Sequence, residues 1–304
     1  MQNMSWVTRW EDWRRAVGRR GSLQRKNVDT FLDSHPAILY WGDSWFSTPL
    51  YLNLARQSAK RIQGLNMIIG KPGATAAELF GEARVSELAD RIQSNPFDLV
   101  CLSAGGNDCL DENLAGVFKD WMGKHPKRSD RLDAVQAFAI FQSSKLLDGV
   151  TRSYDRLLKC LKKIQTQRPG LRVIGHPYVP IDRIGQPADL SVDNIGLIAW
   201  FKDDVGPWLW GPMQKVLTNK TEGKAFARLM LVEGFHNSVL LALEQKYPGL
   251  FSVVDYSSVT ATHGSAFWND EIHPTERGFD LLASPFNQAI KAALPSPKQG
   301  AVSA

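Results

Sequence analysis

The sequence has few cysteines, and their positions favour neither disulfides nor a metal site. Three cysteines occur in 304 residues, at Cys101, Cys109 and Cys160. An odd number at wide spacing gives no disulfide framework and no paired C-x-x-C motif of the kind that holds zinc. We therefore expect no structural disulfide and no metal, so the chemistry of any site has to come from other side chains.

The sequence also lacks recognisable targeting and membrane-spanning segments. The first residues do not show the basic-then-apolar pattern of a signal peptide. No apolar run approaches the roughly 20 residues that a helix needs to cross a bilayer. We expect a cytoplasmic protein by default, and export by a signal-independent route is left open.

Several common catalytic and cofactor motifs are absent. The sequence contains no G-x-G-x-x-G dinucleotide fingerprint and no H-E-x-x-H zinc motif. Residues 64–71 superficially suggest a phosphate-binding loop, but the glycine spacing is one residue too long and Pro72 stands where Ser or Thr is required. The G-x-S-x-G elbow of the α/β-hydrolases is also missing. We expect no cofactor.

Positive charge is in modest excess and unevenly distributed. The formal net charge is +5, and much of the basicity lies near the N-terminus, at Arg9, Arg14, Arg15, Arg19, Arg20, Arg25 and Lys26. Such a local excess favours an anionic partner or surface. It is too small to indicate nucleic-acid binding, and no nucleic-acid motif accompanies it. We expect no nucleic-acid partner.

Residues 1–35 form a basic, tryptophan-bearing extension. Trp6, Trp10, Trp13 and Val17 are spaced by four, three and four residues, which puts them on one face of a helix. One interpretation is a helix packed on the main domain. The other is an interfacial helix with tryptophans at the boundary of an anionic membrane and arginines toward its headgroups.

The remaining sequence alternates short apolar runs with amphipathic stretches, which predicts a parallel α/β sheet. The expected strands are residues 36–43, 66–70, 97–103, 171–175 and 251–255, and helices are expected at about 50–63 and 75–93. Residues 109–150 are expected to be irregular around 123–133 and amphipathic from there to Leu147. Five such strands predict a flavodoxin-like three-layer α/β/α sandwich. We expect one domain over residues 36–294 with insertions at about 109–150 and 179–222, followed by a disordered tail at 295–304.

The first of these strands ends in Gly42-Asp43-Ser44. In open parallel sheets the carboxyl edge is where ligands bind, and glycine permits the sharp turn out of the strand. Ser44 is therefore expected at an accessible position. A serine hydroxyl is a weak nucleophile, so catalysis would need a base and an oxyanion site elsewhere in the sequence.

Four polar segments follow predicted strands or precede the last helix, positions that converge on one edge of such a sheet. They are residues 42–44 (Gly-Asp-Ser), 72–75 (Pro-Gly-Ala-Thr), 105–108 (Gly-Gly-Asn-Asp) and 270–274 (Asp-Glu-Ile-His-Pro). Each is weak alone, but in this order the set resembles the SGNH, or GDSL-type, serine hydrolases over about residues 37–292. The sequence departs from that family beside the serine, where Trp45 replaces the usual Leu or other aliphatic residue.

The resemblance implies a role for each matching position. Ser44 corresponds to the nucleophile, His273 to the general base, and Asp270 to the acid that orients the imidazole. The backbone N–H groups of Ser44 and Gly73 and the side-chain amide of Asn107 correspond to the oxyanion hole. Glycine at 73 would let the backbone approach the oxyanion without an intervening Cβ.

Other polar and aromatic residues near these segments have two interpretations. Asp255 and His263 are the rival acid and base, with His263 expected to be solvated or packed in its loop. Asp43 and Asp108 are expected to brace loops by hydrogen bonds. Trp45, His176 and Trp268 are the candidates for substrate contact, although each also suits a structural role.

The predicted activity is the hydrolysis of a carboxylic ester through an acyl-serine intermediate. The basic, tryptophan-bearing N-terminus and the aromatics near the site favour a lipid or other acyl ester. Alternatives on the same residues are carbohydrate O-acetylesterase, thioesterase and acyltransferase activity. A non-catalytic binding module on the same scaffold is the alternative of another class.

Overall fold

The computed structural model describes residues 6–48, 52–187, 206–259 and 266–304. Its centre is one sheet of five strands in the order β2-β1-β3-β4-β5, and every pair is parallel. This is the flavodoxin-like order, and it confirms the predicted fold class. The strands are β1 (Ala37–Gly42), β2 (Leu65–Gly70), β3 (Leu99–Ser103), β4 (Arg172–Gly175) and β5 (Phe251–Val253).

The three strands nearest the expected site end level with one another. Gly42 at the end of β1 pairs with Gly70 of β2 and with Ser103 of β3. A Cβ at Gly70 would lie 1.8 Å from the Gly42 carbonyl oxygen, so only glycine fits this close approach. The loops that leave these strands therefore start from one line at the carboxyl edge.

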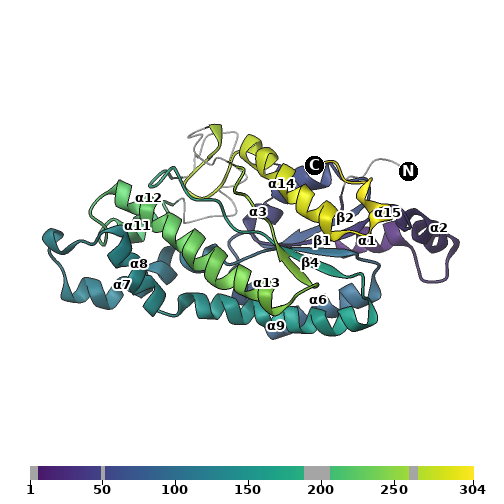
Figure 1. Cartoon of the computed structure of the whole chain (residues 1–304), viewed down its shortest axis with the longest axis horizontal. Helices are drawn as coiled ribbons and strands as arrows, with labels where there is room; N and C mark the ends of the chain where they lie inside the picture. The colour runs from purple at the N-terminus through teal and green to yellow at the C-terminus, as the bar shows by residue number, and fades with distance from the viewer. Residues whose placement is uncertain (1–5, 49–51, 188–205, 260–265) are drawn as a thin grey trace.

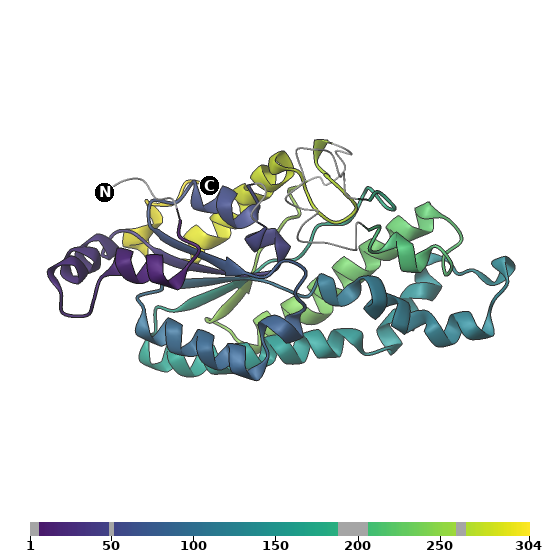
Figure 2. The same cartoon turned by 180° about the vertical axis from the view of Figure 1, so that it is seen from behind.

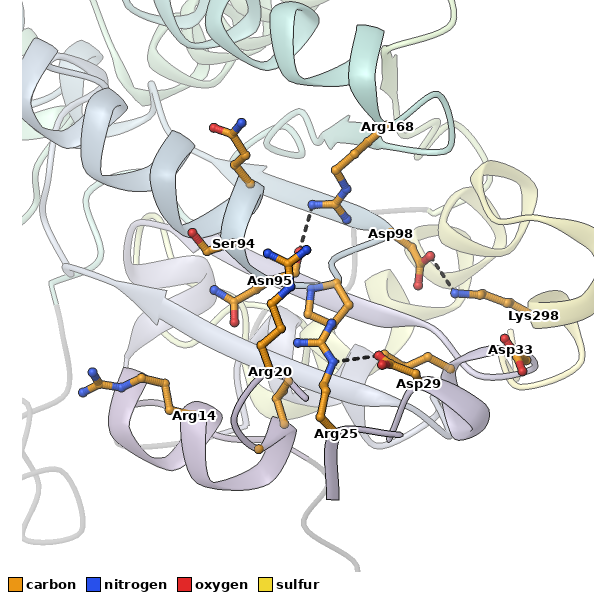
Figure 3. Close-up of a pocket in the computed structure, with 15 residues that line it drawn as sticks. Arg14, Arg20, Arg25, Asp29, Asp33, Ser94, Asn95, Asp98, Arg168 and Lys298 are labelled. Carbon is orange, nitrogen blue, oxygen red and sulfur yellow. Dashed lines mark hydrogen bonds and ion pairs between the residues drawn. The ribbon is translucent and has the colours of Figure 1, made fainter. Parts of the chain in front are cut away.

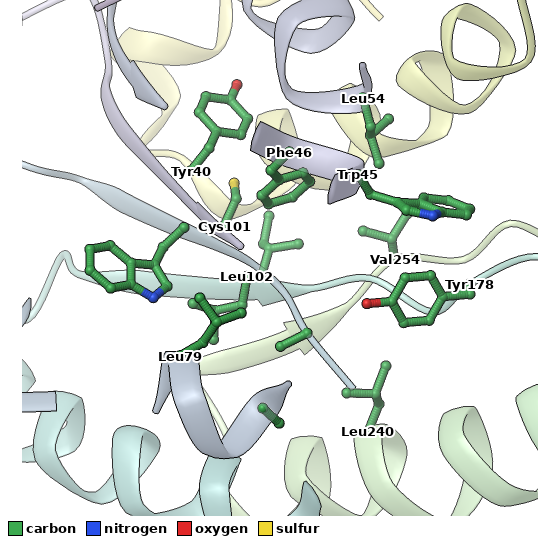
Figure 4. Close-up of a cluster of buried hydrophobic side chains, with 14 of the residues drawn as sticks. Tyr40, Trp45, Phe46, Leu54, Leu79, Cys101, Leu102, Tyr178, Leu240 and Val254 are labelled. Atoms are coloured by element: carbon green, nitrogen blue, oxygen red, sulfur yellow. The ribbon is translucent and has the colours of Figure 1, made fainter. Parts of the chain in front are cut away.

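Helices cover both faces of the sheet, giving the expected three layers. On one face lie α4 (Leu54–Ala59) and α14 (Glu276–Ala293), and on the other α6 (Glu82–Ser94), α9 (Leu146–Gln167) and α13 (Ala242–Lys246) (Figures 1 and 2). Figure 4 shows the core on both sides of the strands, with Tyr40 and Phe46 above and Leu79 and Leu240 below. All four side chains are buried, as fits strands that are apolar on both faces.

The two predicted insertions contribute helices to a lobe beyond the carboxyl edge of the sheet (Figure 1). The first was expected to be partly irregular, but it holds two regular helices, the second begun by a capping box between Asp133 and Gln136. The lobe consists of α7 (Asp111–Lys124), α8 (Ala134–Ser143), α11 (Trp210–Met213) and α12 (Lys220–Leu229).

A continuous helical stretch runs from the lobe back to the sheet as α12, the π-helical segment η4 (Met230–Leu241) and α13. Within the described residues this stretch, Lys220–Lys246, is the one helix long and apolar enough to cross a membrane, and 50% of its most apolar window is buried inside the protein. The sequence was not expected to provide such a helix. Because η4 packs against α9 and β5, burial in the core accounts for its apolar residues.

The N-terminal extension forms two helices, α1 (Trp10–Val17) and α2 (Leu23–Leu32), and Trp6 precedes the first. Trp13 is buried, stacks on Phe97 at 4.5 Å between ring centroids and donates its indole N–H to Asn95. The tryptophan face thus packs on the domain, as the first interpretation has it. Contact with an anionic membrane stays a prediction, and it would rest on the arginines.

Val7, just before these helices, lies along the outer edge of β2. Its N–H donates to the Asn66 carbonyl and its own carbonyl accepts from the Ile68 N–H, both at 2.9 Å. It forms a parallel bridge with Met67. The outer edge of the sheet is therefore paired at this point.

The C-terminal residues differ from the expectation, because 295–304 are ordered instead of forming a disordered tail. They contain the short helix α15 (Ser296–Gln299), and Val302 forms an antiparallel bridge with Ile62. Val302 is buried. A bridge to a residue so far back in the chain cannot be read from a short polar C-terminus.

Two helix predictions were also too long. The expected helix over 75–93 is divided into α5 (Ala76–Leu79) and α6, which begins after Gly81. The helical stretch expected from residue 50 to about 63 is reduced to α4, and residues 49–51 lie outside the described part. A one-turn helix that was not predicted, α3 (Ser44–Ser47), follows β1 directly.

Candidate active site

Ser44 is the first residue of α3, immediately after the turn out of β1. Asp43 caps this turn, because its carboxylate accepts the Trp45 N–H at 3.0 Å. The Ser44 side chain is nearly buried, and its Oγ lies 3.0 Å from Nε2 of His273. The hydroxyl and the imidazole are therefore within hydrogen-bond distance across 229 residues of sequence.

The segment that carries His273 is a tight turn before α14. The Asn269 N–H donates to the His273 carbonyl at 2.9 Å. Asp270 closes the turn from within, since its Oδ1 accepts the N–H groups of Ile272 and His273 at 2.8 and 2.7 Å. Its Oδ2 lies 2.9 Å from Nδ1 of the same imidazole. One short turn thus holds a carboxylate against the imidazole nitrogen that faces away from Ser44.

The electrostatics of this group favour a positively charged imidazole. Burial acts to lower the pKa of His273, but the charge and hydrogen bond of Asp270 outweigh it, and the charge of Asp43 adds to them. The net result is a pKa raised above the ordinary value for histidine. An imidazole in this setting accepts a proton more readily than one in water, as a general base requires.

Gly73 lies beside Ser44 in the loop after β2, and both line the same cavity with Asn107 and His273. Its φ is +76°, in the left-handed region that favours glycine. A Cβ added here would meet nothing within 4 Å. The backbone conformation by itself therefore favours glycine here, and the predicted clearance for an oxyanion stays a prediction.

Asn107 begins a short 3-10 helix after β3, and its side-chain amide donates to the Ala74 carbonyl at 3.0 Å. The adjacent Asp108 accepts the Ala76 N–H at 2.7 Å. These two bonds join the loop of Gly73 to the loop of Asn107. Burial raises the pKa of Asp108 to about 6, against the opposing effect of its backbone hydrogen bonds, and its position fits the bracing role expected for it.

All four polar segments therefore meet at one edge of the sheet. Ser44, Gly73, Asn107 and His273 line one cavity, and Asp270 lies directly behind the histidine. The resemblance to SGNH hydrolases predicted that these residues would meet, and the structure brings them together.

Comparisons with known proteins find only low similarity. No family model matches the sequence, and no curated protein matches it. Among solved structures, a family 3 carbohydrate esterase from Clostridium thermocellum is 12% identical, with a TM-score of 0.43, over 85% of this chain and 96% of that one. Phospholipase A1 from Streptomyces albidoflavus is 16% identical, with a TM-score of 0.43, over 84% and 99%.

An extracellular lipase from Streptomyces rimosus is similar to the same extent. It is 13% identical with a TM-score of 0.42, over 84% of this chain and 99% of that one. Likenesses of this size carry no argument about substrate, so the chemistry of the site has to rest on its own geometry.

Asp43 does more than cap the turn. Its buried carboxylate also accepts the Ser103 hydroxyl at 2.7 Å and the Tyr178 hydroxyl. Three donors from α3, β3 and the loop after β4 therefore converge on the side chain that precedes Ser44. This network fits the bracing role expected for Asp43, and its Tyr178 partner was not anticipated from the sequence.

The three candidates for substrate contact lie in different positions. Trp45 and Trp268 are buried and line a small cavity that also contains Ser44. His176 is fully buried behind Trp45, stacked on it at 5.5 Å, and Nδ1 lies 2.9 Å from the Pro177 carbonyl. Burial lowers the pKa of His176 to about 4. Its position is that of a neutral core histidine, and it lines neither of the two cavities at Ser44.

The rival acid, Asp255, is not brought to this site. Asp255 is exposed and accepts the N–H and hydroxyl of Ser257, and the backbone hydrogen bond is the main reason that its pKa is lowered. His263 lies outside the described residues. Asp255 does not line the cavities that contain Ser44.

Glu271 is a buried residue of the candidate site that sequence reasoning missed, although it lies between Asp270 and His273. Its carboxylate is fully buried and accepts three backbone N–H groups, from Gly185 at 2.7 Å, Leu209 at 2.7 Å and Trp210 at 3.0 Å. Burial raises its pKa in spite of these bonds. Glu271 thus fastens two parts of the second insertion to the turn that carries the imidazole.

Trp208, in the same insertion, packs edge-to-face on the His273 ring at 5.7 Å between centroids. Its carbonyl accepts the Asp111 N–H at 2.9 Å, which ties it to the start of α7. Trp208 follows no predicted strand, so no local pattern marks it. Only the pairing of Glu271 with the neighbouring backbone brings it to the imidazole.

A further cavity lies at the amino edge of the sheet, and its volume of about 730 Å³ exceeds those of the two cavities at Ser44. Figure 3 shows its charged lining, where Arg25 pairs with Asp29 and Lys298 with Asp98. Arg168 donates to the carbonyls of Ile92, Asn95 and Phe97. The paired charges therefore compensate one another, and Arg168 satisfies carbonyl groups at the carboxyl end of α6. None of the predicted site residues lines this cavity.

Proposed function

We propose that the protein hydrolyses carboxylic esters through an acyl-serine intermediate. The observation that carries this proposal is the continuous chain of contacts from Ser44 Oγ to His273 Nε2 at 3.0 Å and from His273 Nδ1 to Asp270 Oδ2 at 2.9 Å. The raised pKa of His273 supports it, because the imidazole has to hold a proton during the reaction.

In the first half of the reaction, Ser44 Oγ attacks the carbonyl carbon of the ester while its proton passes to Nε2 of His273. The tetrahedral intermediate carries its negative charge on the former carbonyl oxygen. Collapse of this intermediate breaks the bond to the alcohol oxygen, which leaves with the proton from Nε2. The acyl group remains on Ser44, and Asp270 stabilises the imidazolium throughout without taking its proton.

In the second half, water attacks the acyl-serine and gives a proton to Nε2. That proton returns to Ser44 Oγ as the bond to the carboxylic acid breaks, so the enzyme is regenerated. No external oxidant, reductant or cofactor enters the balance. An acceptor alcohol in place of water would give acyl transfer by the same steps.

The oxyanion donors in this proposal are the N–H groups of Ser44 and Gly73 and the second amide hydrogen of Asn107. Within the described residues, neither N–H group has a protein acceptor among the hydrogen bonds found. The Ser44 N–H is the first of a helix, where intrahelical partners are lacking. Asn107 is held by its bond to Ala74, so its amide is positioned before substrate arrives.

The test is a serine-directed probe combined with turnover. A fluorophosphonate should label Ser44, as located by mass spectrometry, and the protein should hydrolyse p-nitrophenyl acetate. Ser44→Ala should abolish both while the far-UV circular dichroism is unchanged. Ser94→Ala, which lies at the amino-edge cavity, is the matched control and should keep full activity. Wild-type turnover in Ser44→Ala would refute the proposal.

A further inference from the structure

The space around Ser44 is divided into two cavities of different size and chemistry. The larger is about 410 Å³ and has polar groups along its rim, including Thr75, Glu112 and Asn113. The smaller is about 40 Å³ and its lining is largely apolar. Both contain Ser44 and Asn107, so the two cavities meet at the hydroxyl and the expected oxyanion donor.

An ester carbonyl at that junction has to direct its acyl group into one cavity and its alcohol into the other. The apolar walls of the small cavity suit a hydrocarbon chain, because burial of apolar surface is favourable. Hydroxyl, carboxylate and amide groups suit an alcohol that forms hydrogen bonds. The chemistry of the walls therefore assigns the small cavity to the acyl group.

The volume of the small cavity sets how much of an acyl chain it holds. At about 40 Å³ it has about a tenth of the volume of the larger cavity, at about 410 Å³. An acetyl group fits this space, whereas a long acyl chain would need the walls to move.

Two side chains from one segment close the small cavity. Met230 and Leu231 are the first two residues of η4, and both are buried and line the small cavity. The wide turns of π-helices are rare and occur frequently at functional sites. Here the π-helical segment starts where α12 leaves the lobe, so the change in helix type coincides with the wall of the cavity.

The segment is held in place on both sides, so the wall cannot easily retreat. Phe235 packs on the backbone of Gly105, where an added Cβ would lie 2.5 Å from the ring. The same ring lies 5.5 Å from that of Tyr178. On the other side, a Cβ at Gly234 would lie 3.0 Å from Leu147 of α9. Close contacts of this kind resist added volume, and overpacking a well-filled site is destabilising.

We propose that Met230 and Leu231 restrict the enzyme to short acyl groups, of about the size of acetyl, on a hydrogen-bonding alcohol. This inference rests on the proposed ester hydrolysis and narrows the lipid-ester expectation to short-chain esters. The two side chains act as specificity-determining residues, because each fills space that a longer chain would occupy.

The experiment compares kcat/KM on p-nitrophenyl esters with acyl chains of two, four, six, eight and sixteen carbons. The wild-type kcat/KM should be highest for the acetate ester and about tenfold or more lower for the hexanoate ester, because the added methylenes clash with the wall of the small cavity. Met230→Ala and Leu231→Ala should move the optimum to longer chains, by about fourfold in relative kcat/KM for each methylene newly buried. Hexadecanoate should remain a poor substrate with or without anionic vesicles.

Val239→Ala is the matched control, since Val239 is buried in the same segment but does not line the cavity. It should keep the wild-type chain-length profile. Leu231→Val should shift the profile in the same direction as Leu231→Ala, by less, and serves if the alanine variant does not fold. Equal turnover of acetate and octanoate by wild type overturns the inference, as does an unchanged profile in both alanine variants.

The two proposals fail in distinguishable ways. If Ser44 is not labelled by the fluorophosphonate and no chain length is turned over, the proposed hydrolysis is wrong, and this inference falls with it. If Ser44 is labelled and acetate is hydrolysed, but the profile does not depend on Met230 or Leu231, only the inference about chain length is wrong.

Discussion

At the amino edge of the sheet the cavity is large and lined by charges, whereas at the carboxyl edge the cavities are smaller and the ionisable groups next to Ser44 are buried. Arg25, Asp29 and Lys298 at the amino edge form ion pairs with solvent-exposed or partly exposed side chains. Asp270 and His273 at the carboxyl edge are almost fully buried. Exposed pairs are screened by water and contribute little, while buried charges interact strongly and shift each other's pKa.

The comparison shows that cavity size is a poor guide to the site. The charged groups at the amino edge already form ion pairs with one another or hydrogen bonds to the carbonyls at the end of α6. The carboxyl edge brings together a hydroxyl, an imidazole and a carboxylate in one line, with backbone N–H groups beside them. Matched substitutions at the two edges should therefore have very different effects on turnover.

The largest effect is expected for the buried carboxylate. Asp270→Asn should lower kcat by about 10⁴, because it removes the group that fixes and charges the imidazole. Asp98→Asn at the amino edge should leave kcat unchanged and affect only stability, since Asp98 bonds Lys298 and the Ala37 N–H. The measurement is steady-state hydrolysis of p-nitrophenyl acetate, corrected for the folded fraction.

The same variant should change the pH dependence. The imidazole acts as a base when neutral, so wild-type kcat/KM should rise with pH through the raised pKa of His273. Asp270→Asn removes the main cause that raises this pKa, so the acidic limb should move to lower pH. The Asp270–His273 pair also adds to the free energy of unfolding. This contribution is fully present below the ordinary histidine pKa and is lost as pH rises through the raised pKa of His273. If the acidic limb of the pH profile does not move in Asp270→Asn, the group that titrates in that limb is not His273.

The next effect is expected at the amide. Asn107→Ala should lower kcat by about 10² to 10³ with little change in KM, because it removes a donor to the developing oxyanion. Asn95→Ala at the amino edge should leave kcat unchanged and reduce the free energy of unfolding by about 1 kcal/mol, because the Trp13 indole loses its acceptor. Equal losses of kcat in the two variants would contradict the comparison.

A smaller effect is expected for Glu271, whose carboxylate joins the second insertion to the turn that carries His273. In Glu271→Gln one amide oxygen has to serve three N–H groups, and the amide NH₂ faces donors. The turn of His273 and the position of Trp208 should loosen, lowering kcat/KM by about tenfold to 100-fold, as small misplacements do. Glu82→Gln, which changes an exposed side chain at the start of α6 outside both cavities at Ser44, is the control. A stability loss without any change in kcat/KM would make Glu271 purely structural.

The smallest effect on turnover is expected at the arginine of the amino edge. Arg168→Met removes donors to three carbonyls, so thermal unfolding should show a loss of about 2–4 kcal/mol. The kcat/KM of the folded protein should be unchanged. Arg20→Met, which changes an exposed side chain of the same cavity, should alter stability by less than about 0.5 kcal/mol.

The sequence contained enough to predict the sheet and the meeting of Ser44 with His273. Continuous apolar runs that end in glycine and polar residues mark the buried strands, and the carboxyl edge follows from their parallel order. The sequence did not reveal the role of Glu271, because its partners near residues 185 and 210 belong to an insertion without periodic pattern. Nor did it reveal the pairing of Val302 with Ile62, which depends on where two distant segments come to lie.

Local patterns also left the surroundings of two residues open. Gly73 was predicted to give an oxyanion clearance, and the structure adds a second reason for glycine, a positive φ. His176 was expected as a candidate for substrate contact because it follows a strand, yet Trp45 covers it. A side chain at a strand end is buried or exposed according to what the neighbouring loops place over it, and that information is not local.

The pairing of Val7 with the outer edge of β2 has a consequence for self-association. An uncovered outer strand offers a row of N–H and C=O groups to which a second molecule can add its own strand. Val7 occupies two of these groups. A protein shortened to begin after residue 8 would therefore be expected to form dimers or larger aggregates with rising concentration, and addition of a peptide with the sequence of residues 1–9 should reverse this.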